Sequence, residues 1–152
     1  INGQIDAWLP VNEAVGGDTA FIIPNTDTTL TIPSTSERVI TVGAYDSVNI
    51  STVGFSGRGY TRATEYIKPE LVAPGVNILT TTVGVSVSSF TGTSAAAPFV
   101  SGSVALLMEW GIVDRNDIFL YGERLKAFLC NGAIRDNSRE YPKENGDMAD
   151  YA

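Results

Sequence analysis

Histidine is absent from the 152 residues of this chain, and cysteine occurs once, as Cys130. A chain without histidine supplies neither an imidazole general base nor the imidazole ligands of most zinc enzymes. A single cysteine makes no internal disulfide and no cysteine-rich metal centre. We therefore expect no zinc site of these kinds and assign no metal ligand and no cofactor, while the sequence leaves calcium sites open. Any histidine-dependent chemistry needs a residue from outside this chain.

Positive charge is scarce as well: the chain has 10 Lys and Arg against 17 Asp and Glu, a formal net charge of −7. An acidic protein repels phosphate groups, so we expect no nucleic-acid partner and no binding to an anionic membrane. The longest apolar runs, Ala95–Val100 and Val104–Met108, are separated by Ser101–Ser103. Each is shorter than the ~20 residues that cross a bilayer, so no membrane span is expected.

Hydrophobic residues make up 43% of the 152 residues, which is enough for the core of about one domain. The first residues, Ile1–Gln4, have neither the basic nor the apolar region of a signal peptide, and there is no starting Met. We expect the chain to be a segment of a longer protein, with residues 136–152 as a polar surface or frayed tail.

A helix over Ala95–Trp110 is the most strongly predicted element, because apolar residues recur there every three or four positions and mark one buried face. Thr93 or Ser94 is placed to cap its amino terminus, and Gly111 is placed to end it. Gly102 inside the helix is unfavourable by about 1 kcal/mol relative to Ala. A close-packed neighbour would explain that glycine.

A second helix is expected over Gly122–Cys130, with Leu125, Phe128 and Leu129 facing inward. The β-branched run Arg38–Tyr45 is typical of a strand buried on both faces, as in a parallel sheet. Shorter strands are predicted at Phe21–Ile23, Thr28–Ile32, Glu70–Ala73, Val76–Thr80 and Ser86–Phe90. The pattern indicates an α/β protein with a mostly parallel sheet and packed helices.

The run Gly92–Gly102 (GTSAAAPFVSG) places a serine hydroxyl at the first turn of the long helix. A helix amino terminus offers free N–H groups and about half a positive charge. Both would stabilise the oxyanion that forms when Ser94 Oγ attacks a carbonyl. Taken alone, a Ser or Thr before a helix is more often only an N-cap.

The whole run resembles the nucleophile signature of the subtilisin-like serine proteases (peptidase family S8), G-T-S-x-A-x-P-x-V-x-G. Two blocks, Arg38–Asp46 (RVITVGAYD) and Phe55–Gly75 (FSGRGYTRATEYIKPELVAPG), resemble the same family in order and spacing. The segments Ala7–Pro10, Ala105–Ile112 and Tyr121–Arg135 look like a bacterial, clostridial-type branch that includes spore germination proteases. The resemblance covers about residues 5–135.

This resemblance implies the C-terminal part of a three-layer α/β fold and an endopeptidase that acts on proteins or peptides. It implies a Ser-His-Asp triad, of which this chain carries only the nucleophile Ser94, whose backbone N–H would join the oxyanion hole. The Asp and His are expected upstream, so the isolated chain is expected to be inactive. None of these local residues stands in the family's context for the Asp or for the oxyanion-binding Asn: Asn2, Asn12, Asn25, Asp6, Asp18, Asp27 and Asp46. The alternative is a non-catalytic subtilase relative that binds a partner or signal.

Other positions follow from the same resemblance. Thr31, Ile32 and Pro33 map near the wall of the primary specificity pocket, with ordinary strand-end residues as the alternative. Phe99 takes a position where well-known subtilisins carry a structural His, which does not bear on activity. We interpret three basic side chains as solvated loop charges rather than contacts to an acidic substrate: Arg58, Arg62 and Lys68.

Half of such a sheet exposes an apolar edge and face where the missing strands belong. We therefore expect a partner: the N-terminal half of the same domain, or a second copy of this chain. By family, the parent protein is expected to be secreted, bound to the cell envelope or associated with spores.

Overall fold

The computed structural model describes residues 5, 7–9, 19–25, 27–62, 64–84 and 86–134. The expected tail, residues 136–152, lies outside the described residues, as do Asn2, Asp6, Asn12 and Asp18. The elements in chain order are β1 (Val42–Asp46), β2 (Ser51–Thr52), β3 (Gly59–Tyr60), β4 (Ile67–Lys68), β5 (Leu71–Pro74), β6 (Ile78–Thr81), β7 (Val87–Phe90), the α-helix α2 (Thr93–Met108), the π-helix η1 (Glu109–Val113) and the α-helix α3 (Gly122–Gly132).

The centre of the molecule is a parallel pair of strands, β1 and β5, whose register runs from Val42 opposite Leu71 to Tyr45 opposite Pro74. The short β2 lies antiparallel on the other edge of β1. The pairs β3–β4 and β6–β7 are antiparallel, so β1–β5 is the one parallel pair among the described strands. The α/β class is confirmed; the three-stranded sheet is mixed, and the two two-stranded sheets are antiparallel.

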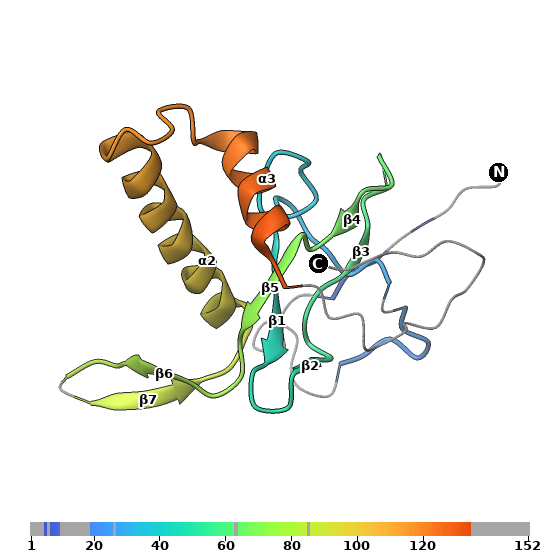
Figure 1. Ribbon diagram of the computed structural model, residues 1–152. Helices are drawn as coiled ribbons and strands as arrows, with labels where there is room; N and C mark the ends of the chain where they lie inside the picture. The colour runs from blue at the N-terminus through green and yellow to red at the C-terminus, as the bar shows by residue number, and fades with distance from the viewer. Residues whose placement is uncertain are drawn as a thin grey trace.

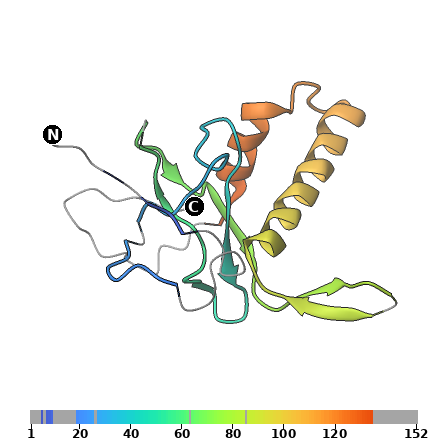
Figure 2. The same cartoon turned by 180° about the vertical axis from the view of Figure 1, so that it is seen from behind.

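Helix α2 packs beside the β1–β5 pair, and the chain then turns back so that α3 runs down alongside β5 (Figure 1). The β6–β7 hairpin projects away from this body, as the view from behind also shows (Figure 2). All four residues of β7 are exposed to solvent. The hairpin leads directly into α2, so the long helix starts where the projecting ribbon rejoins the body.

Small side chains make up the core between α2 and the sheet. Ala44 of β1 and Ala73 of β5 meet Ala96 of α2, and all three are buried. Alanine lets the helix axis approach the strands closely. Gly75, directly after β5, belongs to the same packing, because a Cβ there would lie 2.5 Å from the Cβ of Ala44.

The start of α2 differs from the sequence prediction. The helix begins at Thr93, and its N-cap is Gly92, with no side-chain capping hydrogen bond. The expectation that Thr93 or Ser94 caps the helix is therefore wrong. The amide of Gly92 donates to the Gly75 carbonyl at 2.9 Å, so the end of β5, rather than a capping side chain, holds the helix start.

The other end of α2 also differs, because η1 continues the helix to Val113 and Gly111 does not end it. Gly111 is buried, and a Cβ at this position would lie 2.8 Å from the side chain of Leu120. Tight packing against the segment before α3, not termination, explains this glycine. Gly102 is the reverse case: its expected close neighbour is not found, since a Cβ added at this position would have no described atom within 4 Å.

The continuous helix Thr93–Val113 has 21 residues and is long and apolar enough to cross a membrane, by length and composition alone. The expectation that no apolar segment is long enough to cross a bilayer is therefore wrong, because this helix has the required length. Ser101 and Ser103 do not break the helix, because their hydroxyls donate to carbonyls one turn earlier at 3.1 and 3.0 Å. Core helices of water-soluble proteins meet the same criterion, so the finding does not establish a membrane span.

The strands predicted at Phe21–Ile23 and Thr28–Ile32 do not form. Thr28 makes a single bridge to Gly59, and Ile22 and Ile23 are almost fully exposed. Proline at positions 24 and 33 cannot donate to a ladder, which explains why neither segment extends into a sheet. In α3 the buried residue is Leu125, while Phe128 remains about half exposed.

Candidate active site

Ser94 is the second residue of α2, and it is exposed. The two following alanines, Ala95 and Ala96, are buried and fix the first turn against the sheet. Because Gly92 is bonded to Gly75 at the end of β5, Ser94 lies at the carboxyl edge of the parallel pair. Ligands of open α/β sheets bind at this edge.

The electrostatics of the helix start favour an anion. The first turn of α2 contains no acidic residue, and no side chain caps its N–H groups. The N–H groups of a first turn have no partner within the helix, and the helix dipole adds partial positive charge there. The Ala95 amide bonds to the Gly92 carbonyl at 3.0 Å, so a negative oxygen held beside Ser94 would meet the amides of Thr93 and Ser94.

No proton acceptor accompanies this serine in the part of the chain that the structure describes. The Ser94 hydroxyl forms no hydrogen bond with any described residue, and the chain has no histidine. Asp27 pairs with Arg58 at 4.0 Å, and Asp46 accepts from the Val48 amide at 2.9 Å within its own turn. Across the described ranges, no group of three His, Cys, Asp or Glu side chains could hold a metal ion.

Two hollows flank the segment Thr31–Pro33. One, of about 400 Å³, is lined by Thr31, by Ser34 and by Thr93, the neighbour of Ser94. The structure therefore brings part of the sequence-predicted wall close to the start of α2. Pro33 lines neither hollow, although it is exposed like Thr31 and Ile32.

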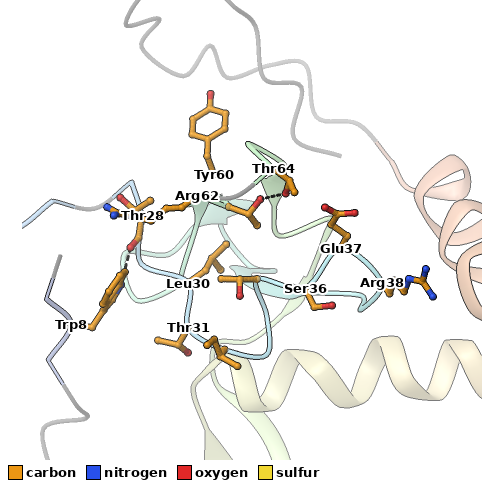
Figure 3. A pocket seen from close by; sticks show the side chains of 13 residues that line it. Trp8, Thr28, Leu30, Thr31, Ser36, Glu37, Arg38, Tyr60, Arg62 and Thr64 are labelled. Carbon is orange, nitrogen blue, oxygen red and sulfur yellow. Dashed lines mark hydrogen bonds between the residues drawn. The ribbon is translucent and has the colours of Figure 1, made fainter. Parts of the chain in front are cut away.

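The second hollow, of about 730 Å³, is shared between Thr31, Ile32 and residues of β3 and its following turn. Trp8 borders it and donates from Nε1 to the Thr28 carbonyl at 2.9 Å (Figure 3). The guanidinium of Arg62 lies 5.9 Å from the Trp8 ring centroid. Trp8 is thus held at the rim of this hollow by a hydrogen bond and a cation–π contact, and its side chain stays about half exposed.

The sequence interpretation of Lys68 as a solvated loop charge is wrong, because its side chain is only 1% exposed. Its Nζ donates to the Val39 carbonyl at 3.1 Å, to Thr41 Oγ1 at 3.2 Å and to Glu70 Oε1 at 2.7 Å. Lys126 of α3 also bonds to Glu70 Oε1. We call Lys68, Glu70 and Lys126 the lysine cluster.

Sequence reasoning missed Glu70 and Lys126. The signal for Lys68 was its place between Ile67 and Pro69 in a run of strand residues, with a carboxylate two positions later. Nothing in the sequence pairs Lys126 with residues more than fifty positions away, so only the fold reveals that contact.

Burial and the charges of the lysine cluster together shift the pKa values of Glu70 and Cys130. Burial alone would raise the pKa of Glu70, but hydrogen bonds from Lys126, Lys68 and the Thr41 amide outweigh it and hold the pKa below its ordinary value of 4.5. Burial raises the pKa of the Cys130 thiol, and the nearby Glu70 charge adds to the effect. Cys130 is therefore a half-buried thiol, not an activated one.

Comparison with known proteins gives a consistent picture. The family model of the Subtilase family matches residues 11–149. The chain is similar to an uncharacterized protein of Aquifex aeolicus (35% identity, 75% of this chain, 58% of the relative). It is also similar to the serine protease AprX of Bacillus subtilis (35% identity, 68% of this chain, 26% of the relative).

Among solved structures, the CspB protease of Clostridium perfringens is similar at 51% sequence identity with a TM-score of 0.76. The match covers 82% of this chain and 27% of that protein. The chain thus spans less than two thirds of the length of these relatives.

Proposed function

The chain belongs to the subtilase family, and we propose that it is the nucleophile-bearing segment of a subtilisin-like endopeptidase, with Ser94 as the nucleophile. The observation that carries the proposal is the position of Ser94. It is exposed in the first turn of α2, within a run that resembles the family signature, beside the end of a parallel strand.

In the proposed reaction, Ser94 Oγ attacks the carbonyl carbon of the scissile peptide bond while a histidine base takes its proton. The histidine then returns the proton to the leaving amine, and water hydrolyses the acyl-enzyme. The free N–H groups at the start of α2, including that of Ser94, hold the oxyanion. Thr31, Ile32 and Pro33 bind the substrate side chain before the scissile bond.

The base must come from outside this sequence, because the chain contains no histidine. The proposed source is the upstream half of the same domain, which also supplies the Asp. The chain alone is therefore inactive, since a serine without its base is a weak nucleophile. The 51% identity to CspB supports a place in the clostridial branch.

A fluorophosphonate probe tests this function, because it labels only an activated serine. We expect no labelling of Ser94 in the isolated chain and strong labelling when the upstream half of the parent protein is added. Ser94→Ala should abolish the labelling and lower kcat by about a million-fold, the size of the effect of removing the serine in subtilisin itself. Ser101→Ala is the matched control, because Ser101 lies on the same helix and bonds only to a helix carbonyl.

Two results would contradict the proposal. Strong labelling of the isolated chain would mean that another base serves Ser94. Failure to label in the complex with the upstream half would favour the alternative, a non-catalytic subtilase relative that acts by binding.

A further inference from the structure

The lysine cluster contains two cations for one carboxylate, and every donor in it is matched. Lys126 Nζ donates to the Glu37 carbonyl at 2.7 Å, to the Val39 carbonyl at 3.1 Å and to Glu70 Oε1. Lys68 Nζ has three acceptors as well. An ammonium has three N–H donors, so both lysines are fully satisfied. The proposed chemistry uses none of these groups.

The backbone acceptors of the cluster belong to one segment, residues 37–41, which follows the proposed substrate wall in the chain. The two ammonium groups hold this segment at the Glu37 and Val39 carbonyls. Glu70 Oε2 holds it a third time by accepting from the Thr41 amide at 2.8 Å. The segment is thus tied to α3 and to the start of β5 through side chains that are mostly buried.

A short path of hydrogen bonds continues from the cluster to the wall. Thr41 Oγ1 accepts from Lys68 and donates to the Ser34 carbonyl at 2.7 Å. The Ser34 amide donates to the Thr31 carbonyl at 2.8 Å, and the Ser36 amide donates to the Pro33 carbonyl at 3.0 Å. Thr31–Pro33 is exposed, and its described hydrogen bonds run to Ser34, whose hydroxyl also donates to the Thr31 carbonyl, and to Ser36.

From this geometry we propose that the lysine cluster positions Thr31–Pro33, so that Lys126, a residue of α3, controls substrate affinity. This inference rests on the proposed function. Lys126 is a positioning residue: it acts through the backbone of residues 37–41 and does not reach the start of α2.

The same two segments offer a matched control. Arg38 and Glu123 also join residues 37–41 to α3, at 3.8 Å, but their side chains are 88% and 74% exposed. Exposed ion pairs contribute little, because water screens them. Glu123→Gln should therefore leave the wall unchanged, whereas Lys126→Met removes a charge that is 18% exposed and keeps the length of the side chain.

Amide hydrogen exchange on this chain tests the positioning. In Lys126→Met, the amides of Ser34 and Ser36 should exchange about ten-fold faster than in the wild type, while Glu123→Gln leaves them unchanged. Thr41→Val, which removes the hydroxyl between Lys68 and Ser34, should have the same effect without touching α3. Unchanged exchange in both variants, or an equal rise in Glu123→Gln, would overturn the proposal.

Kinetics in the complex with the upstream half test the consequence for substrate. Lys126→Met should raise KM about ten-fold, while the rate of fluorophosphonate labelling of Ser94 stays within about two-fold. A fall in labelling rate with unchanged KM would contradict a role in substrate binding. If the wild-type complex is not labelled at all, the proposed function fails, but the exchange experiment still decides whether the cluster holds the segment.

Discussion

At the residue scale, the burial of Lys68 is the feature that the sequence predicted least well. A charged side chain with almost no access to water is stable only when each of its donors finds an acceptor. Lys68 meets this condition with a carbonyl, a hydroxyl and a carboxylate. The carboxylate of Glu70 is the common acceptor of both lysines, so its ionisation is coupled to the folded state.

Glu70→Gln should change the acid sensitivity of the fold. The pKa of Glu70 is lower in the folded chain than its ordinary value of 4.5, so its charge stabilises the fold above pH 4.5. That contribution is lost as the pH falls below 4.5 through the folded pKa. We expect the variant to be about 2 kcal/mol less stable at neutral pH and to lose less stability on acidification, as measured by urea unfolding.

Asp46→Asn is the control for that measurement. The pKa of Asp46 is also lowered, by the Val48 amide and by Asn49, but this carboxylate lies in an exposed turn. The Asp46→Asn variant should keep the steep acid loss that depends on Glu70. Equal acid slopes in the wild type and Glu70→Gln would show that the lysine cluster does not depend on this carboxylate.

At the element scale, the positions of three glycines show where the long helix packs closely against other elements. Because Gly75 has no side chain, Ala44 and the carbonyl of Gly92 can pack closely against it. Gly111 allows the same close approach of Leu120. These two close approaches hold the helix at both ends against the rest of the described chain. Between them, a Cβ at Gly102 would find no described atom of another element within 4 Å, so the helix is open on the side of Gly102.

Gly111→Ala and Gly102→Ala should therefore have opposite effects. The added methyl at position 111 would lie 2.8 Å from Leu120 and should cost about 1–3 kcal/mol. At position 102 the methyl enters open space, and alanine should stabilise the helix by about 0.5–1 kcal/mol. Thermal unfolding of the two variants measures both effects. A stable Gly111→Ala variant would show that η1 can move away from Leu120.

At the scale of the whole molecule, the main feature is the apolar surface that the long helix exposes to solvent. On the long helix, Leu106 is 68% exposed and Val113 is 71% exposed, although the helix is apolar enough to be a core element. The match with CspB covers 27% of that protein, so most of the CspB chain has no counterpart in this sequence. We infer that the upstream half of the domain covers this face, including Gly102.

The isolated chain should form oligomers, and adding the upstream half should replace them with a complex of the two halves. Size-exclusion chromatography should show a species larger than a monomer for the chain alone and a 1:1 complex after the upstream half is added. Leu106→Asp should weaken both associations, because it puts a charge on the uncovered face. Leu79→Asp, at a leucine of the β6–β7 hairpin that is 77% exposed, is the control. A clean monomer that stays soluble at high concentration would contradict the prediction.

Sequence patterns located the main elements because local periodicity is a property of the chain itself. The β-branched run from Arg38 contains β1, and the apolar spacing after Ser94 marks α2. The bounds moved wherever a tertiary contact outweighed the local signal. Gly92 replaced Thr93 or Ser94 as N-cap because Gly75 bonds to it, and Gly111 continued the helix because Leu120 packs on it.

By itself, then, the sequence determined the α/β class and the serine at a helix start, because both are written in residues that are neighbours along the chain. It also determined that this chain carries no imidazole base, because it contains no histidine. Tertiary structure alone decided that Lys126 reaches Glu70 and the carbonyls of Glu37 and Val39, and that Thr31 and Thr93 line the same hollow. These contacts join residues far apart in sequence, and no local pattern encodes which distant groups will satisfy a buried charge.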